Sequence, residues 1–152
     1  MRIAPGSPLE ADVLELLEQH LADMRRTSPP ESVHALDAAA LAGPAVRFLV
    51  ARGDDGGLLG CGAVKDLGDG TGEVKSMRTV ESARGRGVAA AVLGDLVAHA
   101  RAAGWTALRL ETGMQPFFEP AVRLYLRHGF TPCRPFGDYR EDPSSRYLGL
   151  LL

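Results

Sequence analysis

A glycine-rich turn at residues 84–89, with the sequence Arg-Gly-Arg-Gly-Val-Ala, has residue types suited to binding an anion. Apolar residues before the turn follow a strand-like pattern, whereas those from Val92 to Ala100 recur at helical spacing. A helix that begins on glycines leaves several backbone N–H groups unpaired and directs the positive end of its dipole forward. The turn therefore predicts a site for a phosphate or a diphosphate. On the turn alone, a plain strand–helix connection in which glycine only relieves crowding stays open.

A dinucleotide cofactor is the first alternative ligand for this turn. Residues 85–90 fit the pattern G-x-G-x-x-A, and Glu111 follows roughly where a ribose-binding acid belongs. That fold, however, places its glycines after a buried strand of nearly continuous aliphatic residues. Too little chain follows here for further strand–helix units, and a P-loop is excluded because no Lys-Ser or Lys-Thr follows the glycines. In contrast to the aliphatic strand of a dinucleotide-binding fold, the strand expected before this turn is polar, with Glu73, Lys75, Ser76, Arg78 and Thr79.

The strand-like and helical segments on either side of this turn indicate an α+β fold. Gly/Asp connections at residues 54–57 and 68–72 separate three strand-like segments, which indicates two successive hairpins before the turn. The strand after the central helix can return parallel to the strand before it. We expect a three-layer arrangement: a mixed, mainly antiparallel sheet with one parallel βαβ crossover and helices on both faces. The expected strands are 2–4, 46–51, 58–67, 73–80, 107–112, 130–133 and 147–152. The expected helices start at a capping box of Ser7 and Glu10, at an Asp37 N-cap, at the glycine turn and at Glu119.

Length, charge and cysteine usage narrow the class of protein. A chain of 152 residues predicts one domain, residues 1–152, and a net charge of −2 provides no field for nucleic acid. Neither a signal pattern nor an apolar run of membrane-spanning length is present in the sequence, so we expect a cytoplasmic protein without a membrane partner. Cys61 and Cys133 are expected to be buried and reduced, although a disulfide stays open. The histidines of the expected helices lack a metal-ligand pattern, so no metal is expected. They are His20, His99 and His128.

Two motifs, in the expected order, resemble those of the GNAT acetyltransferase superfamily. The first is Arg84-x-x-Gly87-x-Ala89, which matches the Q/R-x-x-G-x-G/A coenzyme A signature between strand and helix. The second is the segment 121–130, which reads Ala-x-x-Leu-Tyr-x-x-x-Gly-Phe. The resemblance covers nearly the whole chain and implies the acyl-CoA N-acyltransferase fold with acetyl-CoA as cofactor. Several blocks resemble a bacterial subgroup labelled indole-acetate or small-molecule acetyltransferases. The chain departs from the family at Phe118, where many members have an Asn that hydrogen-bonds the pantetheine arm.

The resemblance also implies roles for individual residues. In this superfamily an amine attacks the thioester directly, which calls for a base, a stabilised oxyanion and a proton for the departing thiolate. Tyr125 is the implied acid, with core packing as its alternative explanation. Glu73 is the implied base, with a solvent-facing position as its alternative, and Glu111 is the second candidate. The residues implied to bind the coenzyme are Met77, Arg78, Thr79, Val80, Arg84, Gly85, Arg86, Gly87, Val88 and Ala89.

The acceptor site is expected in loops that border the cleft. His34, Asp138 and Tyr139 are candidates, each with a structural explanation as well, and the acid-rich loop 135–145 favours an amine-bearing small molecule or peptide. Two functions stay open. The first is an acetyl-CoA-dependent N-acetyltransferase, and the second is a non-catalytic acyl-CoA-binding sensor, which the exchange of Asn for Phe118 favours. A homodimer is a further expectation from the family.

Overall fold

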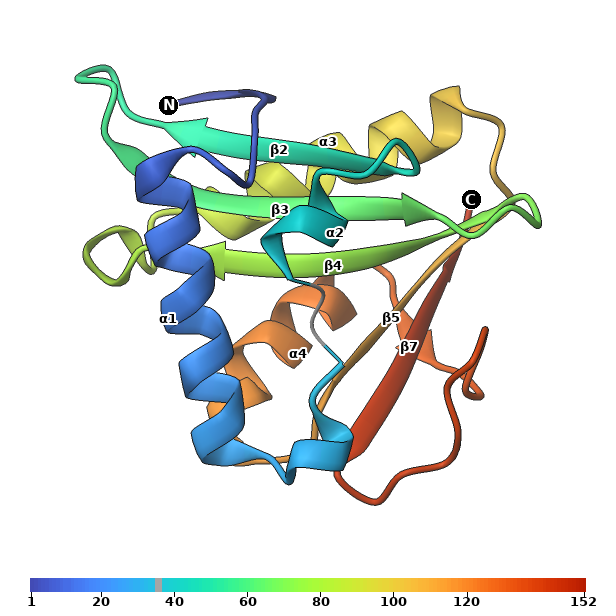
Figure 1. The fold of residues 1–152 in the computed structure, drawn as a ribbon. Coiled ribbons are helices and arrows are strands. Elements are labelled where there is room, and N and C mark those ends of the chain that lie inside the picture. The colour runs from blue at the N-terminus through green and yellow to red at the C-terminus, as the bar shows by residue number, and fades with distance from the viewer. Residues whose placement is uncertain (35–36) are drawn as a thin grey trace.

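The computed structural model describes residues 1–34 and 37–152. Its strands are β1 (Arg2–Pro5), β2 (Val46–Arg52), β3 (Leu58–Asp66), β4 (Thr71–Thr79), β5 (Ala107–Gly113), β6 (Thr131–Pro132) and β7 (Ser145–Leu151). The α-helices are α1 (Ala11–Thr27), α2 (Ala38–Leu41), α3 (Val88–Ala102) and α4 (Glu119–Arg127), and the 3-10 helices are η1 (Pro30–Ser32), η2 (Glu81–Ala83) and η3 (Pro116–Phe118). The strands form a seven-stranded sheet in the order β1-β2-β3-β4-β5-β7-β6 (Figure 1). Within the described residues, neighbouring strands of the sheet are antiparallel except for β4 and β5, which are parallel and are connected by α3.

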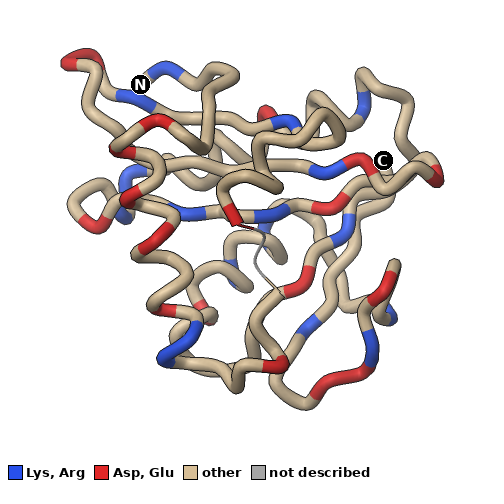
Figure 2. Tube along the Cα trace, in the orientation of Figure 1, with Lys and Arg blue, Asp and Glu red and all other residues tan. Residues whose placement is uncertain are grey.

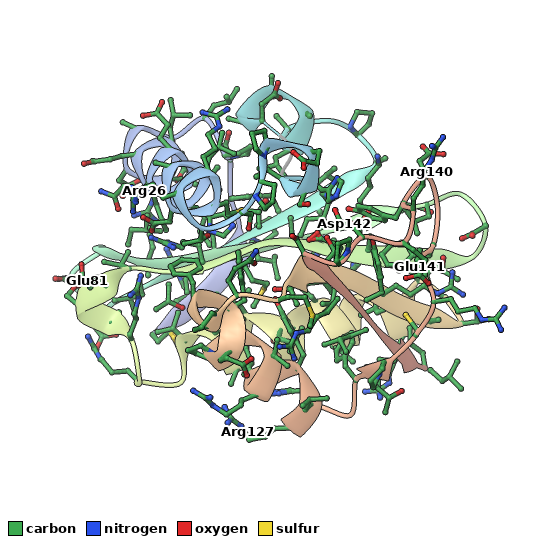
Figure 3. The ribbon with its side chains drawn as sticks, turned by 90° about the horizontal axis from the view of Figure 1, so that it is seen from below. Arg26, Glu81, Arg127, Arg140, Glu141 and Asp142 are labelled. Atoms are coloured by element: carbon green, nitrogen blue, oxygen red, sulfur yellow. The ribbon has the colours of Figure 1, made fainter. Side chains whose placement is uncertain are left out.

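Helices cover both faces of the sheet, which gives the three layers visible from below in Figure 3. On one face, Val13 and Leu16 of α1 and Leu41 of α2 pack against Phe48 and Val50 of β2. On the other face, α3 and α4 share a larger apolar cluster with β3, β4 and β5. Each fully buried aliphatic side chain contributes about 1.5–3 kcal/mol to this packing. The predicted α+β class, the mixed sheet and its one parallel crossover are confirmed.

The parallel pair separates partway along its length. β4 and β5 pair only from Thr71–Glu73 to Ala107–Arg109, although β4 continues to Thr79 and β5 to Gly113. Figure 1 shows the two strands diverging beyond the paired part. The edge of β4 that faces β5 therefore carries backbone groups without a strand partner over its second half.

A β-bulge deforms β4 where the strands diverge. Cys61 pairs with Arg78 and Ala63 with Lys75, so β4 has one residue more than β3 in this interval. Ser76 lies within the bulge with a φ of 56°, a conformation that is rare for residues other than glycine. Gly62 faces the bulge across the sheet, and a Cβ there would lie 2.5 Å from the sulfur of a β4 methionine. Gly62 thus leaves room for the Met77 side chain beside the bulge.

Charged residues of both signs are interspersed along the described chain, as Figure 2 shows, and the net charge of the sequence is −2. None of the helices in residues 1–34 and 37–152 is long and apolar enough to cross a bilayer.

Three local expectations were wrong. The Glu10 carboxylate accepts a hydrogen bond from the Ser7 N–H and the Ser7 hydroxyl accepts one from the Leu9 N–H, but these bonds close a turn, and α1 begins only at Ala11 because Glu10 is not yet helical. The strand expected at residues 130–133 shortens to β6, since the N–H of Phe130 bonds back to the end of α4. Cys133 is exposed because it follows this short edge strand, whereas Cys61 is buried, and both thiols are free.

Candidate active site

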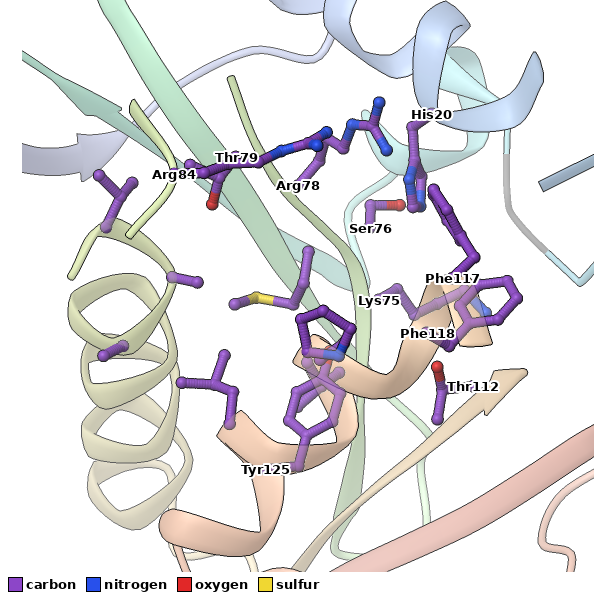
Figure 4. A pocket seen from close by; sticks show the side chains of 18 of the residues that line it. His20, Lys75, Ser76, Arg78, Thr79, Arg84, Thr112, Phe117, Phe118 and Tyr125 are labelled. Carbon is purple, nitrogen blue, oxygen red and sulfur yellow. The ribbon is translucent and has the colours of Figure 1, made fainter. Parts of the chain in front are cut away.

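A cavity of about 520 Å³ opens where β4 and β5 diverge. This volume suits a small-molecule ligand. Figure 4 shows its walls, with α3 and Tyr125 on one side and His20, Phe117 and Phe118 on the other. The lining includes both apolar and polar side chains. The apolar or aromatic ones include Met77, Val88, Ala89, Ala90, Leu124 and Tyr125, and the polar or charged ones include His20, His34, Glu73, Lys75, Arg78, Glu111 and Tyr139.

The turn before α3 presents unpaired backbone amides to this cavity. Within the described residues, no carbonyl or side chain accepts a hydrogen bond from the N–H groups of residues 85–90. Gly85 and Gly87 have φ angles of 75° and 80°, which glycine adopts without steric cost. A Cβ on either would meet no heavy atom within 4 Å, so these glycines serve the backbone conformation and do not relieve crowding. Free amides at the start of a fifteen-residue helix fit a diphosphate.

The free edge of β4 continues from this turn along the cavity. Met77 and Thr79 line it, and beyond Glu73 no strand pairs with this edge among the described residues. An extended ligand with amide groups can hydrogen-bond such an edge as an added strand would. Val80 differs, because its N–H already donates to the carbonyl of Leu59 at 2.8 Å and it does not line the cavity.

Glu73 lies in a buried polar network. Its Oε2 accepts hydrogen bonds from Tyr139 Oη at 2.5 Å and from Lys75 Nζ at 3.1 Å. Lys75 Nζ also donates to Tyr139 Oη at 3.2 Å and to the His34 carbonyl at 3.4 Å. Burial and the Glu73 carboxylate raise the pKa of Tyr139 well above its ordinary range, so its phenol stays protonated. The structure brings together the expected base Glu73 and the expected acceptor residues His34 and Tyr139. The Glu73 carboxylate, however, already accepts hydrogen bonds from Tyr139 and Lys75.

Glu111 lies in a different environment at the far end of β5. Burial raises its pKa from 4.5 to about 7, with the neighbouring charge of Glu73 adding to the rise and that of Lys75 opposing it. Its Oε2 is buried and has no hydrogen-bond partner among the described residues. A carboxylate with these properties can accept a proton near neutral pH.

Tyr125 belongs to both the core and the cavity. It packs against Phe130 at a ring separation of 5.8 Å and is almost fully buried, yet it lines the cavity. Burial, together with the charge of Glu111, raises the pKa of Tyr125 above its ordinary range. Core packing and a role as proton donor are therefore compatible at this position.

The remaining expected site residues are divided between the cavity wall and other positions. Arg84 lines the cavity, whereas Arg86 and Asp138 are exposed and do not. Asp37 caps α2 by accepting a hydrogen bond from the Ala40 N–H at 2.7 Å. Phe118, which replaces the family's Asn, is buried.

Sequence reasoning missed residues that α1 and η3 bring to the cavity. His20 and Met24 come from α1, and Phe117 comes from η3. Helical spacing alone places His20 beside the apolar face of α1, but only the tertiary packing of α1 across β4 places it in the cavity. No local signal distinguishes it from the other helical histidines.

The chain matches the model of the acetyltransferase (GNAT) family over residues 13–130. It is 47% identical over 137 residues to the uncharacterized N-acetyltransferase YsnE of Bacillus subtilis, covering 90% of this chain and 89% of that protein. It is 42% identical over 150 residues to an IAA acetyltransferase of Azospirillum brasilense, covering 96% and 94% of the two chains. A solved Klebsiella pneumoniae structure, described as an acyl-CoA N-acyltransferase, superposes with a TM-score of 0.81 at 28% identity over 99% of this chain and 97% of that one.

These similarities extend over nearly the whole chain and agree with the two sequence motifs and with the free amides before α3. The family expected from the sequence is thereby confirmed, and acetyl-CoA is the cofactor that the site fits. The chain belongs to the acetyltransferase (GNAT) family and is an acetyl-CoA-dependent N-acetyltransferase.

Proposed function

We propose that this enzyme acetylates a primary amine of a small molecule or peptide, and that the amine attacks directly while both substrates are bound. The observation that carries the proposal is the combination of unpaired amides at residues 85–90 with a cavity that reaches the half-buried Glu111, whose Oε2 is buried. Acetyl-CoA, when bound, supplies an acetyl group activated as a thioester.

Main-chain groups do most of the coenzyme binding in this proposal. The amides of residues 85–90 bind the diphosphate, and the Arg84 side chain adds positive charge beside them. The free edge of β4 at Met77–Thr79 binds the amides of the pantetheine arm. Phe118 has no polar side-chain atom to offer the arm, so the main chain must supply these contacts.

Glu111 is the proposed general base. Its pKa of about 7 means that a large fraction is ionised at neutral pH while its affinity for a proton stays high. Its free Oε2 can receive the proton of the acceptor ammonium. Glu73 is instead a positioning residue, because Tyr139 and Lys75 occupy its Oε2 and hold the polar wall of the cavity in place.

Tyr125 is the proposed general acid. Its raised pKa keeps the Oη proton in place at neutral pH, which a proton donor requires. Its position in the cavity wall and its tight packing against Phe130 would hold the hydroxyl in one orientation.

Calorimetry and a thiol-release assay test this function. We expect acetyl-CoA to bind in the micromolar range or tighter and at least one amine in a panel to release free CoA thiol. Glu111→Gln should lower turnover by at least 100-fold at pH 7, whereas the exposed Glu141→Gln serves as control and should not change it. Tight acetyl-CoA binding without thiol release for any amine would favour a sensor instead, and absence of binding would overturn the coenzyme site.

A further inference from the structure

A group of polar side chains at the α1 side of the cavity takes no part in the proposed proton transfers. His20 of α1 and Ser76 and Arg78 of β4 all line the cavity. Figure 4 shows the three side chains close to one another, with Phe117 beside His20. They come from elements that are far apart in the sequence, so the fold assembles this group.

Two of the three side chains have a buried polar atom that forms no hydrogen bond within the part of the chain that the structure describes. His20 Nδ1 and Arg78 Nε are buried and have no partner among the described residues. Asp23 engages only one terminal nitrogen of the Arg78 guanidinium, through Nη2. Native proteins pair nearly all buried hydrogen-bonding groups. Two neighbouring unpaired groups in a cavity wall therefore indicate that a ligand forms hydrogen bonds with them.

His20 is neutral here. Burial and the nearby charge of Arg78 lower its pKa to about 4. A neutral imidazole offers one N–H donor, whereas the guanidinium of Arg78 remains a cation with its Nε–H free. The pair therefore suits an acceptor-rich, negatively charged group.

Ser76 adds a third donor and a sign of strain. It is the one residue other than glycine with a positive φ in the described chain, at 56°. Such strain is found where a side chain or backbone must be aimed at a ligand. Its hydroxyl lies toward His20 in Figure 4 and makes no hydrogen bond with any of residues 1–34 and 37–152.

The cavity is consequently polarised. The donors Ser76 and Arg78 follow Lys75 along β4 and lie beside His20 of α1, whereas the carboxylate Glu73 precedes Lys75 on β4 and the carboxylate Glu111 lies on β5. A ligand with a carboxylate at one end and an amine at the other would match both regions, with apolar surface from Phe117 available beside His20.

We propose that the acceptor is a primary amine that also carries a carboxylate. The carboxylate accepts hydrogen bonds from Arg78 Nε–H, from the imidazole N–H of His20 and from the Ser76 hydroxyl, and it orients the amine toward Glu111. This inference rests on the proposed function, because it specifies the substrate of the same site.

The test compares matched pairs of acceptors, each an amino acid and its carboxamide, with separations between amine and carboxylate from that of glycine to that of 6-aminohexanoate. For the best pair we expect kcat/KM to favour the acid by about 10- to 100-fold. Arg78→Lys keeps the charge beside Asp23 but removes the Nε–H, and His20→Phe removes the second donor, so each should reduce the preference several-fold. The matched control Arg25→Lys, at an exposed position of α1, should keep it.

A binding measurement separates this inference from the proposed function. The amine-free analogue of the preferred acid, or each amine-free acid of the panel if no amino acid turns over, is titrated into the CoA-loaded protein by calorimetry. Binding to wild type that weakens about tenfold or more in Arg78→Lys or His20→Phe, with CoA affinity unchanged, supports the carboxylate site. Equal use of acids and carboxamides, or no binding of any acid while CoA binds, overturns it without touching the enzymatic assignment. Loss of CoA binding in wild type would instead overturn the proposed function itself.

Discussion

Replacing Glu111 by Gln should remove a pH dependence of stability that the buried carboxyl creates. In the folded protein its pKa is about 7, against an ordinary value of 4.5 that applies to the unfolded chain. Between these two pH values the folded state keeps the proton while the unfolded state loses it, so the free energy of unfolding falls as pH rises. The difference in pKa corresponds to about 3 kcal/mol of stability. The folded protein loses this stability as the pH rises to about 7 and does not regain it at higher pH.

Urea unfolding of wild type and Glu111→Gln at pH 5 and at pH 8.5 measures this quantity. The change in stability caused by the substitution should be about 2–3 kcal/mol more favourable at pH 8.5 than at pH 5. Taking the difference between the two pH values cancels any cost of the amide that is independent of pH. The exposed Glu141, labelled in Figure 3, lies in the loop 135–145, and Glu141→Gln should show less than about 0.5 kcal/mol of such difference. Parallel stability curves for wild type and Glu111→Gln would refute a buried carboxyl with a raised pKa.

Three further predictions concern other parts of the site. Gly87→Ala should cost about 1–2 kcal/mol of stability and weaken CoA binding in calorimetry, because a φ of 80° disfavours alanine. Gly94→Ala in the interior of α3, where a Cβ meets nothing within 4 Å, should instead stabilise by about 0.5–1 kcal/mol and leave CoA affinity unchanged; the opposite ranking would contradict the role of the turn. Tyr125→Phe should lower kcat by about 10- to 100-fold in the thiol-release assay with nearly unchanged CoA affinity, and unchanged turnover would remove it from the mechanism. His20 has a pKa of about 4 against an ordinary 6.5, so the unfolded chain binds its proton first and stability falls as pH falls from 6.5 to 4. His20→Phe should flatten this decline in acid unfolding curves, and an unchanged decline would show that His20 is not buried and neutral.

The parts of the fold that local chemistry determines could be predicted from the sequence. The period change around the glycine turn predicts β4, α3 and their connection, and the Gly/Asp connections predict the hairpins on either side of β3. The N-cap at Asp37 also forms as expected. Start and end positions were less predictable where two local solutions compete, as at Ser7 and Glu10, whose side chains satisfy a turn and leave the helix to begin later.

The site could be predicted only where a continuous segment builds it. The amides of residues 85–90 belong to one turn, so the sequence indicates them directly. Which of Glu73 and Glu111 is free to act as a base depends on Tyr139 and Lys75. Tyr139, from the loop 135–145, and Lys75, from β4, hydrogen-bond Glu73, whereas Glu111 Oε2 has no partner among the described residues. Partnering of this kind arises from tertiary packing and has no sequence signal.

The most direct test of the central claim is a titration of ¹⁵N-labelled protein with CoA, followed by amide NMR. The account predicts that the amides of residues 85–90 show the largest shifts, because the diphosphate accepts their hydrogen bonds, while amides in the interior of α3 move little. Saturable CoA binding that leaves these amides unshifted would contradict it.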